Sequence, residues 1–110
     1  MKIEQRVVEA VTVLELSDRL TAAVAAQLRA AVDDAIAAGA DRIVLDLAQV
    51  PFIDSSGLGA VIGALKAART AGGDLRLASA GDQVRQVLRL TNLDRVLRVY
   101  DDAGAAFDGD

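Results

Sequence analysis

Apolar and polar residues follow two different periods along this chain, and each change of period marks a change of element. Residues 3–8 and 11–16 are rich in β-branched side chains, and the two-residue break between them predicts an opening hairpin. From residue 22 to 38, apolar side chains recur every three or four positions, which predicts a helix that stops at Gly39.

The second half repeats the alternation. Residues 42–47 form a short apolar run, and Pro51 disfavours helical geometry at Val50, so we expect a buried strand followed by a loop. A second helix follows the loop and ends at a Gly-Gly pair; its apolar face consists of Leu58, Val61, Ile62, Leu65 and Ala68.

The remaining residues complete the same pattern. They predict a strand at 75–78, a third helix at 82–90 and a last strand at 96–100. Strands that alternate with helices predict an α/β fold, here a single domain over residues 1–110. We expect a mixed, mostly parallel sheet with an N-terminal hairpin and helices packed on it.

Composition excludes nucleic acid as a direct partner. The chain is 53% hydrophobic, enough for a core without metal or disulfides, but Phe52, Tyr100 and Phe107 are its only aromatic residues. Three aromatics scattered along the chain do not make a base-stacking platform. A net charge of -4, with basic residues interspersed among acidic ones, also disfavours binding to a phosphate backbone.

Cysteine and histidine are both absent, which excludes thiolate chemistry, cysteine-ligated zinc and the commonest general base. A small hydrolase using Asp46, Asp54 and Ser55 would lack a base, so we expect no enzyme, no catalytic residue, no metal and no cofactor. The charged N-terminus and the lack of a long apolar run predict no membrane segment and a cytoplasmic location.

The chemistry-bearing segment is Asp-Ser-Ser-Gly-Leu-Gly at 54–59, where a loop enters a helix. The first turn of a helix presents unpaired N–H groups and the positive end of the helix dipole, so it stabilises an anion such as phosphoserine. An aspartate or serine there is also an ordinary N-terminal cap. Local chemistry leaves both readings open. Because Gly57 and Gly59 have no side chains, they would let a partner protein approach the serine hydroxyl closely. Gly59 and Gly63, four residues apart, are expected to pack tightly on the domain's own sheet.

Five segments together carry a resemblance to a known family: Val-Leu-Asp-Leu at 44–47, Val-Pro-Phe-Ile-Asp-Ser-Ser-Gly-Leu-Gly at 50–59, Ala-Gly-Gly at 71–73, residues 87–96, and Tyr-Asp at 100–101. With them the chain resembles the STAS family over essentially its whole length. Within that family it resembles the bacterial anti-sigma factor antagonists that consist of one such domain.

The resemblance implies a function as a phosphorylation switch. Ser55 would accept phosphate from an anti-sigma factor that is also a serine kinase with an ATP-binding domain of the histidine-kinase type. The unphosphorylated form would bind that kinase and release the sigma factor; a metal-dependent serine phosphatase would reset the switch. The phospho-loop or partner-binding residues would be Asp54, Ser56, Gly57, Leu58, Gly59 and Thr21. The resemblance also allows an alternative, a non-phosphorylated adaptor subunit of a lipid-transport ATPase complex.

The chain departs from the family pattern at one site residue. After the second strand the family often has Gly-Arg-Leu-Asp-x-x-Thr, whereas this chain has Asp18, Thr21 and Val24 at the first, fourth and seventh positions. Thr21 therefore replaces the usual carboxylate near the phosphorylation site. The same residue is also suited to be a helix N-cap.

Overall fold

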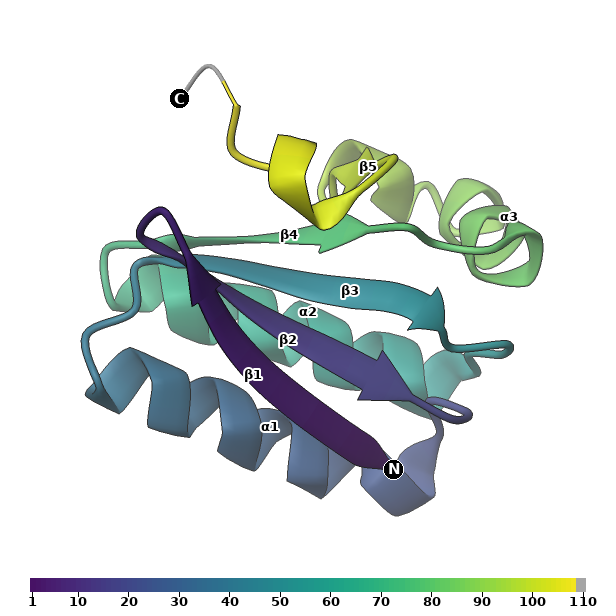
Figure 1. Cartoon of the computed structure of the whole chain (residues 1–110). Coiled ribbons are helices and arrows are strands. Elements are labelled where there is room, and N and C mark those ends of the chain that lie inside the picture. The colour runs from purple at the N-terminus through teal and green to yellow at the C-terminus, as the bar shows by residue number, and fades with distance from the viewer. Residues whose placement is uncertain (109–110) are drawn as a thin grey trace.

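A five-stranded sheet forms the centre of the computed structural model, which describes residues 1–108 (Figure 1). The elements in chain order are β1 (Lys2–Val8), β2 (Val11–Ser17), α1 (Ala22–Ala37), β3 (Arg42–Gln49), α2 (Ser55–Thr70), β4 (Asp74–Ala78), α3 (Asp82–Leu90), the 3-10 helix η1 (Leu93–Arg95), β5 (Val99–Tyr100) and the 3-10 helix η2 (Ala103–Ala105). The strands lie in sequence order, with β1 antiparallel to β2 and all other pairs parallel. The predicted mixed sheet with an opening hairpin is confirmed.

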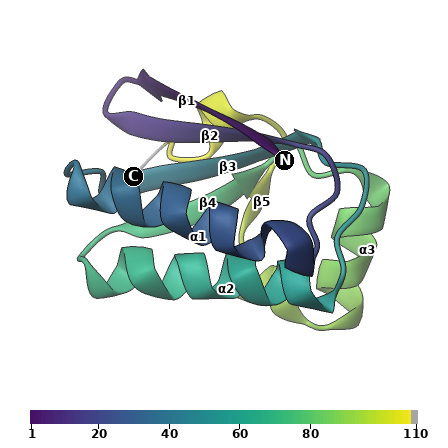
Figure 2. The same ribbon diagram turned by 90° about the horizontal axis from the view of Figure 1, so that it is seen from below.

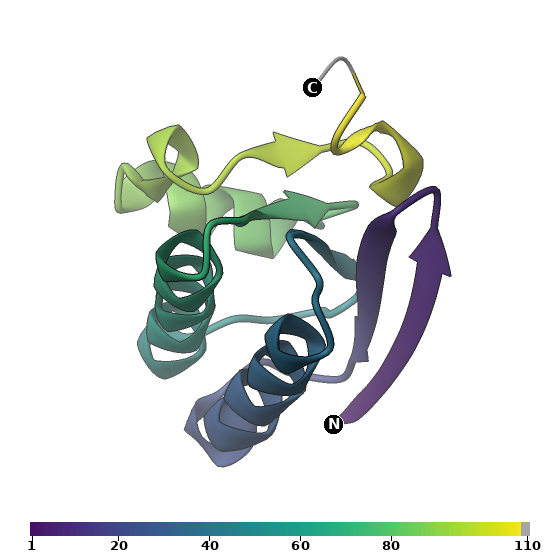
Figure 3. The same ribbon diagram turned by 90° about the vertical axis from the view of Figure 1, so that its left-hand side faces the viewer.

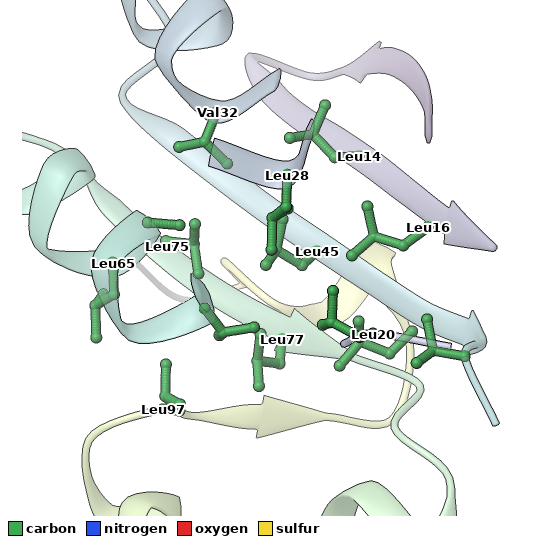
Figure 4. Close-up of a cluster of buried hydrophobic side chains, with 14 of the residues drawn as sticks. Leu14, Leu16, Leu20, Leu28, Val32, Leu45, Leu65, Leu75, Leu77 and Leu97 are labelled. Carbon is green, nitrogen blue, oxygen red and sulfur yellow. The ribbon is translucent and has the colours of Figure 1, made fainter. Parts of the chain in front are cut away.

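Helices α1 and α2 cover one face of the sheet, and α3 packs on the same core near the carboxyl ends of the strands (Figures 2 and 3). Strand alternation directs Leu14, Leu45 and Leu77 to this face, where they meet Leu28 of α1 and Leu65 of α2 (Figure 4). Each of these five side chains is at most 2% exposed. This aliphatic core holds α2 against the sheet and thereby fixes where its N-terminus emerges.

The opposite face is covered only in part, by the segment around η2 (Figure 3). Ala106 and Phe107 pack there on Val13 and Val44, which alternate with the residues that face the helices. No helix within residues 1–108 has both the length and the apolar character that crossing a bilayer requires.

The predicted helix ends follow from glycine conformation. Gly39 and Gly72 have φ of +98° and +90°, in the left-handed region that side chains disfavour, and they stand just after α1 and α2. The last strand is shorter than predicted, because the backbone still turns at its expected start. The N–H groups of Val96 and Leu97 both donate to Leu93 O, at 3.0 and 2.7 Å, so pairing with β4 begins only at Val99.

Candidate functional site at the start of α2

The loop before α2 is held on one side by the chain segment before α1. Leu20 N–H donates to Phe52 O (2.9 Å), and Asp54 N–H donates to Leu20 O (3.3 Å). Leu20 and Ile53 thus form an isolated parallel bridge, and both side chains are buried. The loop therefore behaves as a short extra strand at the carboxyl end of β3.

Gln83 of α3 holds the same loop from another direction. Its side-chain amide donates to Ile53 O (3.0 Å), and its carbonyl oxygen accepts from Ile53 N–H (2.9 Å). A glutamine thereby satisfies both backbone polar groups of a buried residue. Sequence reasoning missed Gln83, since a glutamine thirty residues away in the chain carries no local signal of this contact.

Asp54 is the N-cap of α2. Its Oδ1 accepts from Gly57 N–H at 2.8 Å, and its carbonyl oxygen accepts from Leu58 N–H at 2.9 Å. Of the readings left open for this carboxylate, capping is therefore realised in the structure. The cap fixes the backbone of the first turn of α2, and with it the position of Ser55, the first residue of that helix.

Ser55 and Ser56 are the first two residues of α2, and both are exposed. The N–H groups of Gly57 and Leu58 donate to Asp54, but within residues 1–108 the N–H groups of Ser55 and Ser56 donate to no protein acceptor. Two free donors at the positive end of a sixteen-residue helix favour an anion beside these hydroxyls.

Thr21 lies next to this turn, because it follows Leu20, whose carbonyl oxygen bonds to Asp54 N–H. It occupies the N-cap position of α1, but its hydroxyl makes no capping hydrogen bond. Thr21 therefore stands at the expected N-cap position, but its side chain does not cap the helix. The half-buried Thr21 side chain remains available at the rim of the site.

The three glycines of α2 have different surroundings. A Cβ on Gly57 would lie 2.7 Å from the carbonyl carbon of Leu20, so this glycine is needed for packing within the domain. A Cβ on Gly59 would meet nothing within 4 Å, and on Gly63 it would meet only an Arg29 guanidinium nitrogen at 3.3 Å. The expectation that Gly59 and Gly63 pack on the sheet is wrong: Gly59 is exposed, and Gly63 faces α1.

Leu58 is 6% exposed and belongs to the core, so among the loop residues it anchors the helix. Asp46 lies in β3, with its side chain on the sheet face opposite to the helix-side core. Its position in β3 alternates with Leu45 and Leu47 of the helix-side core, and its carboxylate accepts from Ala48 N–H (3.1 Å) on the other face.

Residues 1–108 contain no group of three or more acidic side chains placed to hold a metal ion.

Arg19 is a further residue at this site that sequence reasoning did not single out. Its guanidinium carbon lies 4.5 Å from the ring centroid of Phe52, which places a positive charge over the loop. A cation–π contact of this kind holds the long side chain near the loop without consuming its hydrogen-bond donors. An aromatic residue in the loop and an arginine on the neighbouring segment were visible in the sequence, but their pairing was not.

Comparison with known proteins places this geometry in a family. Residues 2–106 match the model of the STAS domain. A Thermotoga maritima protein named a candidate anti-sigma factor antagonist is 38% identical over 76 residues, which are 69% of this chain and 67% of that protein. The anti-sigma F factor antagonist of Paenibacillus polymyxa is 29% identical over 102 residues, 92% of this chain and 87% of that protein.

Solved structures agree with the sequence comparison. The crystal structure of a candidate anti-sigma factor antagonist from Thermotoga maritima has a TM-score of 0.85 at 33% identity, covering 93% of this chain and 88% of that one. The anti-sigma factor antagonist SpoIIAA in its unphosphorylated form has a TM-score of 0.64 at 25% identity, covering 86% of this chain and 97% of that one. The predicted STAS-type fold is confirmed.

Proposed function

The chain belongs to the STAS domain family, and on that premise we propose that it is an anti-sigma factor antagonist switched by phosphorylation of Ser55. The unphosphorylated form binds an anti-sigma factor that is also a serine kinase, and the sigma factor is released. Phosphate on Ser55 ends that binding, and a metal-dependent serine phosphatase restores it. The chain acts as a substrate and a binding module, not as an enzyme.

The observation that carries the proposal is the position of Ser55 at the first residue of a rigidly held helix. The hydroxyl is exposed, so a kinase can reach it, while Gln83 and Asp54 hold the backbone on either side. A phosphate there would meet the free N–H groups of Ser55 and Ser56, and the Arg19 guanidinium over Phe52 adds positive charge to the same loop. These groups stabilise the charge without any change of fold.

Gly59 supports a protein partner at the same place. Glycine inside a helix is less favourable than alanine by about 1 kcal/mol, and at Gly59 neither a positive φ nor an internal contact requires it. A surface without a side chain one turn after Ser55 lets a partner backbone approach the hydroxyl closely. An interface with a protein partner would therefore explain why position 59 is a glycine.

The test is phosphorylation by the anti-sigma factor kinase that binds the unphosphorylated chain. We expect ATP to add one phosphate, which peptide mass spectrometry locates on Ser55. Ser55→Ala should abolish it, while the neighbouring control Ser56→Ala should retain it. Phosphate confined to Ser56, or to a residue outside the loop, would refute the assignment.

A binding measurement separates the proposal from the adaptor alternative. A phosphorylation switch requires that the kinase bind the unmodified chain and lose affinity for the Ser55-phosphorylated chain. An adaptor subunit of a lipid-transport ATPase would bind its partner equally with and without the phosphate. Equal affinity of the two forms would therefore overturn the switch and favour the adaptor.

A further inference from the structure

A cavity of about 310 Å³ opens beside the β1–β2 turn, far from the phosphorylation loop. It adjoins Arg42 at the start of β3, whereas the loop to Ser55 leaves the end of that strand. The eight residues of β3 span roughly 25 Å at about 3.3 Å per residue. The turn and the loop lie at opposite ends of the sheet (Figure 1).

The walls of this cavity combine charged residues with an apolar side. Val11 and Val13 line it from β2, and Phe107 lines it from the segment after η2. These residues belong to the small cluster on the sheet face that the helices do not cover. On this side, the apolar part of a ligand would meet hydrocarbon and aromatic surface. The volume is at the lower end of the range for small-molecule sites, about 300 to 1,000 Å³, so the ligand is small.

Arg42 gives the cavity its specific chemistry. Arg42 is half-buried, and its guanidinium carbon lies 5.8 Å from the ring centroid of Phe107. Within the part of the chain that the structure describes, this guanidinium makes no hydrogen bond and no ion pair. Arg6, which lines the same cavity, is instead paired with Glu15 at 2.9 Å. A guanidinium presents five donors in a plane that matches a carboxylate.

Two acidic residues of the lining limit how much negative charge the cavity favours. The carboxylate-bearing residues Glu9 and Asp108 also line it, and their repulsion of an anion grows with its charge, so they oppose a single carboxylate less than a group with two or more charges. Glu9 is held at φ +50° in the hairpin turn, a conformation that non-glycine residues seldom adopt. The turn thus carries an acidic residue of the cavity lining at a position where glycine or asparagine is usual.

We propose that this cavity binds a small organic monocarboxylate. The carboxylate pairs with Arg42, and the hydrocarbon body lies against Val11, Val13 and Phe107. A phosphate or a nucleotide is disfavoured by Glu9 and Asp108, and a neutral analogue lacks the charge that Arg42 would neutralise. The site is separate from Ser55 and does not depend on the phosphorylation proposal.

The test uses hexanoate as the probe, with hexanamide and inorganic phosphate as matched alternatives. In amide NMR titrations of the isolated chain, we expect hexanoate to shift residues 8–13, 42 and 103–108 and to leave 52–59 unchanged. Hexanamide and phosphate should bind at least tenfold more weakly. Equal binding of hexanoate and hexanamide, or shifts confined to another surface, would overturn the proposal.

Variants test the role of the guanidinium directly. Arg42→Gln should weaken hexanoate binding at least tenfold, and Arg42→Lys should fall between that variant and the wild type. Arg95→Gln removes the same charge from an exposed position in η1 and should bind hexanoate like the wild type. Unchanged affinity in folded Arg42→Gln would refute the site. If that variant fails to fold, the comparison of hexanoate with hexanamide on the wild type still decides.

Discussion

Replacing Gly59 by alanine should stabilise the isolated chain and weaken its complex with the anti-sigma factor kinase. Gly59 is the fifth residue of α2, it is exposed, and a Cβ there would contact nothing within 4 Å. The new methyl group therefore creates no strain, and the helix gains about 0.5 to 1 kcal/mol. For a chain of this size, that gain raises the melting temperature by roughly 2 to 5 °C.

The same methyl group would stand where the partner approaches Ser55. Overfilling a packed contact by one carbon typically costs about 1 to 3 kcal/mol. That free energy corresponds to roughly 5-fold to 150-fold weaker binding of the unphosphorylated chain. Because the variant is more stable than the wild type, partial unfolding cannot explain such a loss.

Two controls isolate the effect. Gly57→Ala makes the identical change two residues earlier, where the Cβ would collide with the Leu20 backbone, and it should destabilise the chain by about 1 to 3 kcal/mol. Ala10→Gly relieves a residue held at φ +67° in the distant hairpin turn, and it should stabilise the chain without altering binding.

Urea denaturation gives the stabilities, and calorimetric titration with the kinase gives the affinities. Wild-type affinity in Gly59→Ala would refute the claim that this glycine serves an interface. A loss of stability in Gly59→Ala would show instead that a Cβ at position 59 collides with neighbouring atoms of the domain.

The remaining predictions concern the loop and the switch. Gln83→Ala should lower the free energy of unfolding by about 1 to 3 kcal/mol, because it leaves both polar groups of buried Ile53 unpaired; a loss below 0.5 kcal/mol in urea denaturation would contradict this. Thr21→Asp, which restores the family's usual carboxylate, should change the rate of Ser55 phosphorylation in a kinase assay while shifting stability by about 0.5 kcal/mol or less; the reverse pattern would make Thr21 a structural cap. Phosphorylation of Ser55 should leave the melting temperature and amide spectrum nearly unchanged while it weakens kinase binding by about 2 to 5 kcal/mol, and a large fall in melting temperature would instead indicate a remodelled fold.

Local sequence determined the elements and the place of the candidate site. The hairpin, three helices and most strand positions followed from periodicity, because the faces that strands and helices bury repeat at different intervals. The ends of α1 and α2 followed from Gly39 and Gly72, which adopt positive φ. The Asp-Ser-Ser-Gly segment marked a helix start because capping depends on residues within one turn of each other.

Tertiary structure decided what depends on residues far apart in the chain. The glycine that packs is Gly57, because the Leu20 backbone passes beside it, and periodicity along α2 could not reveal that neighbour. The Gln83 amide reaches Ile53 only when α3 lies beside the loop. The half-buried Arg42 faces a cavity only because the chain after η2 returns over the sheet. Sequence patterns record which side of an element is buried, whereas the partner that buries it is set by packing.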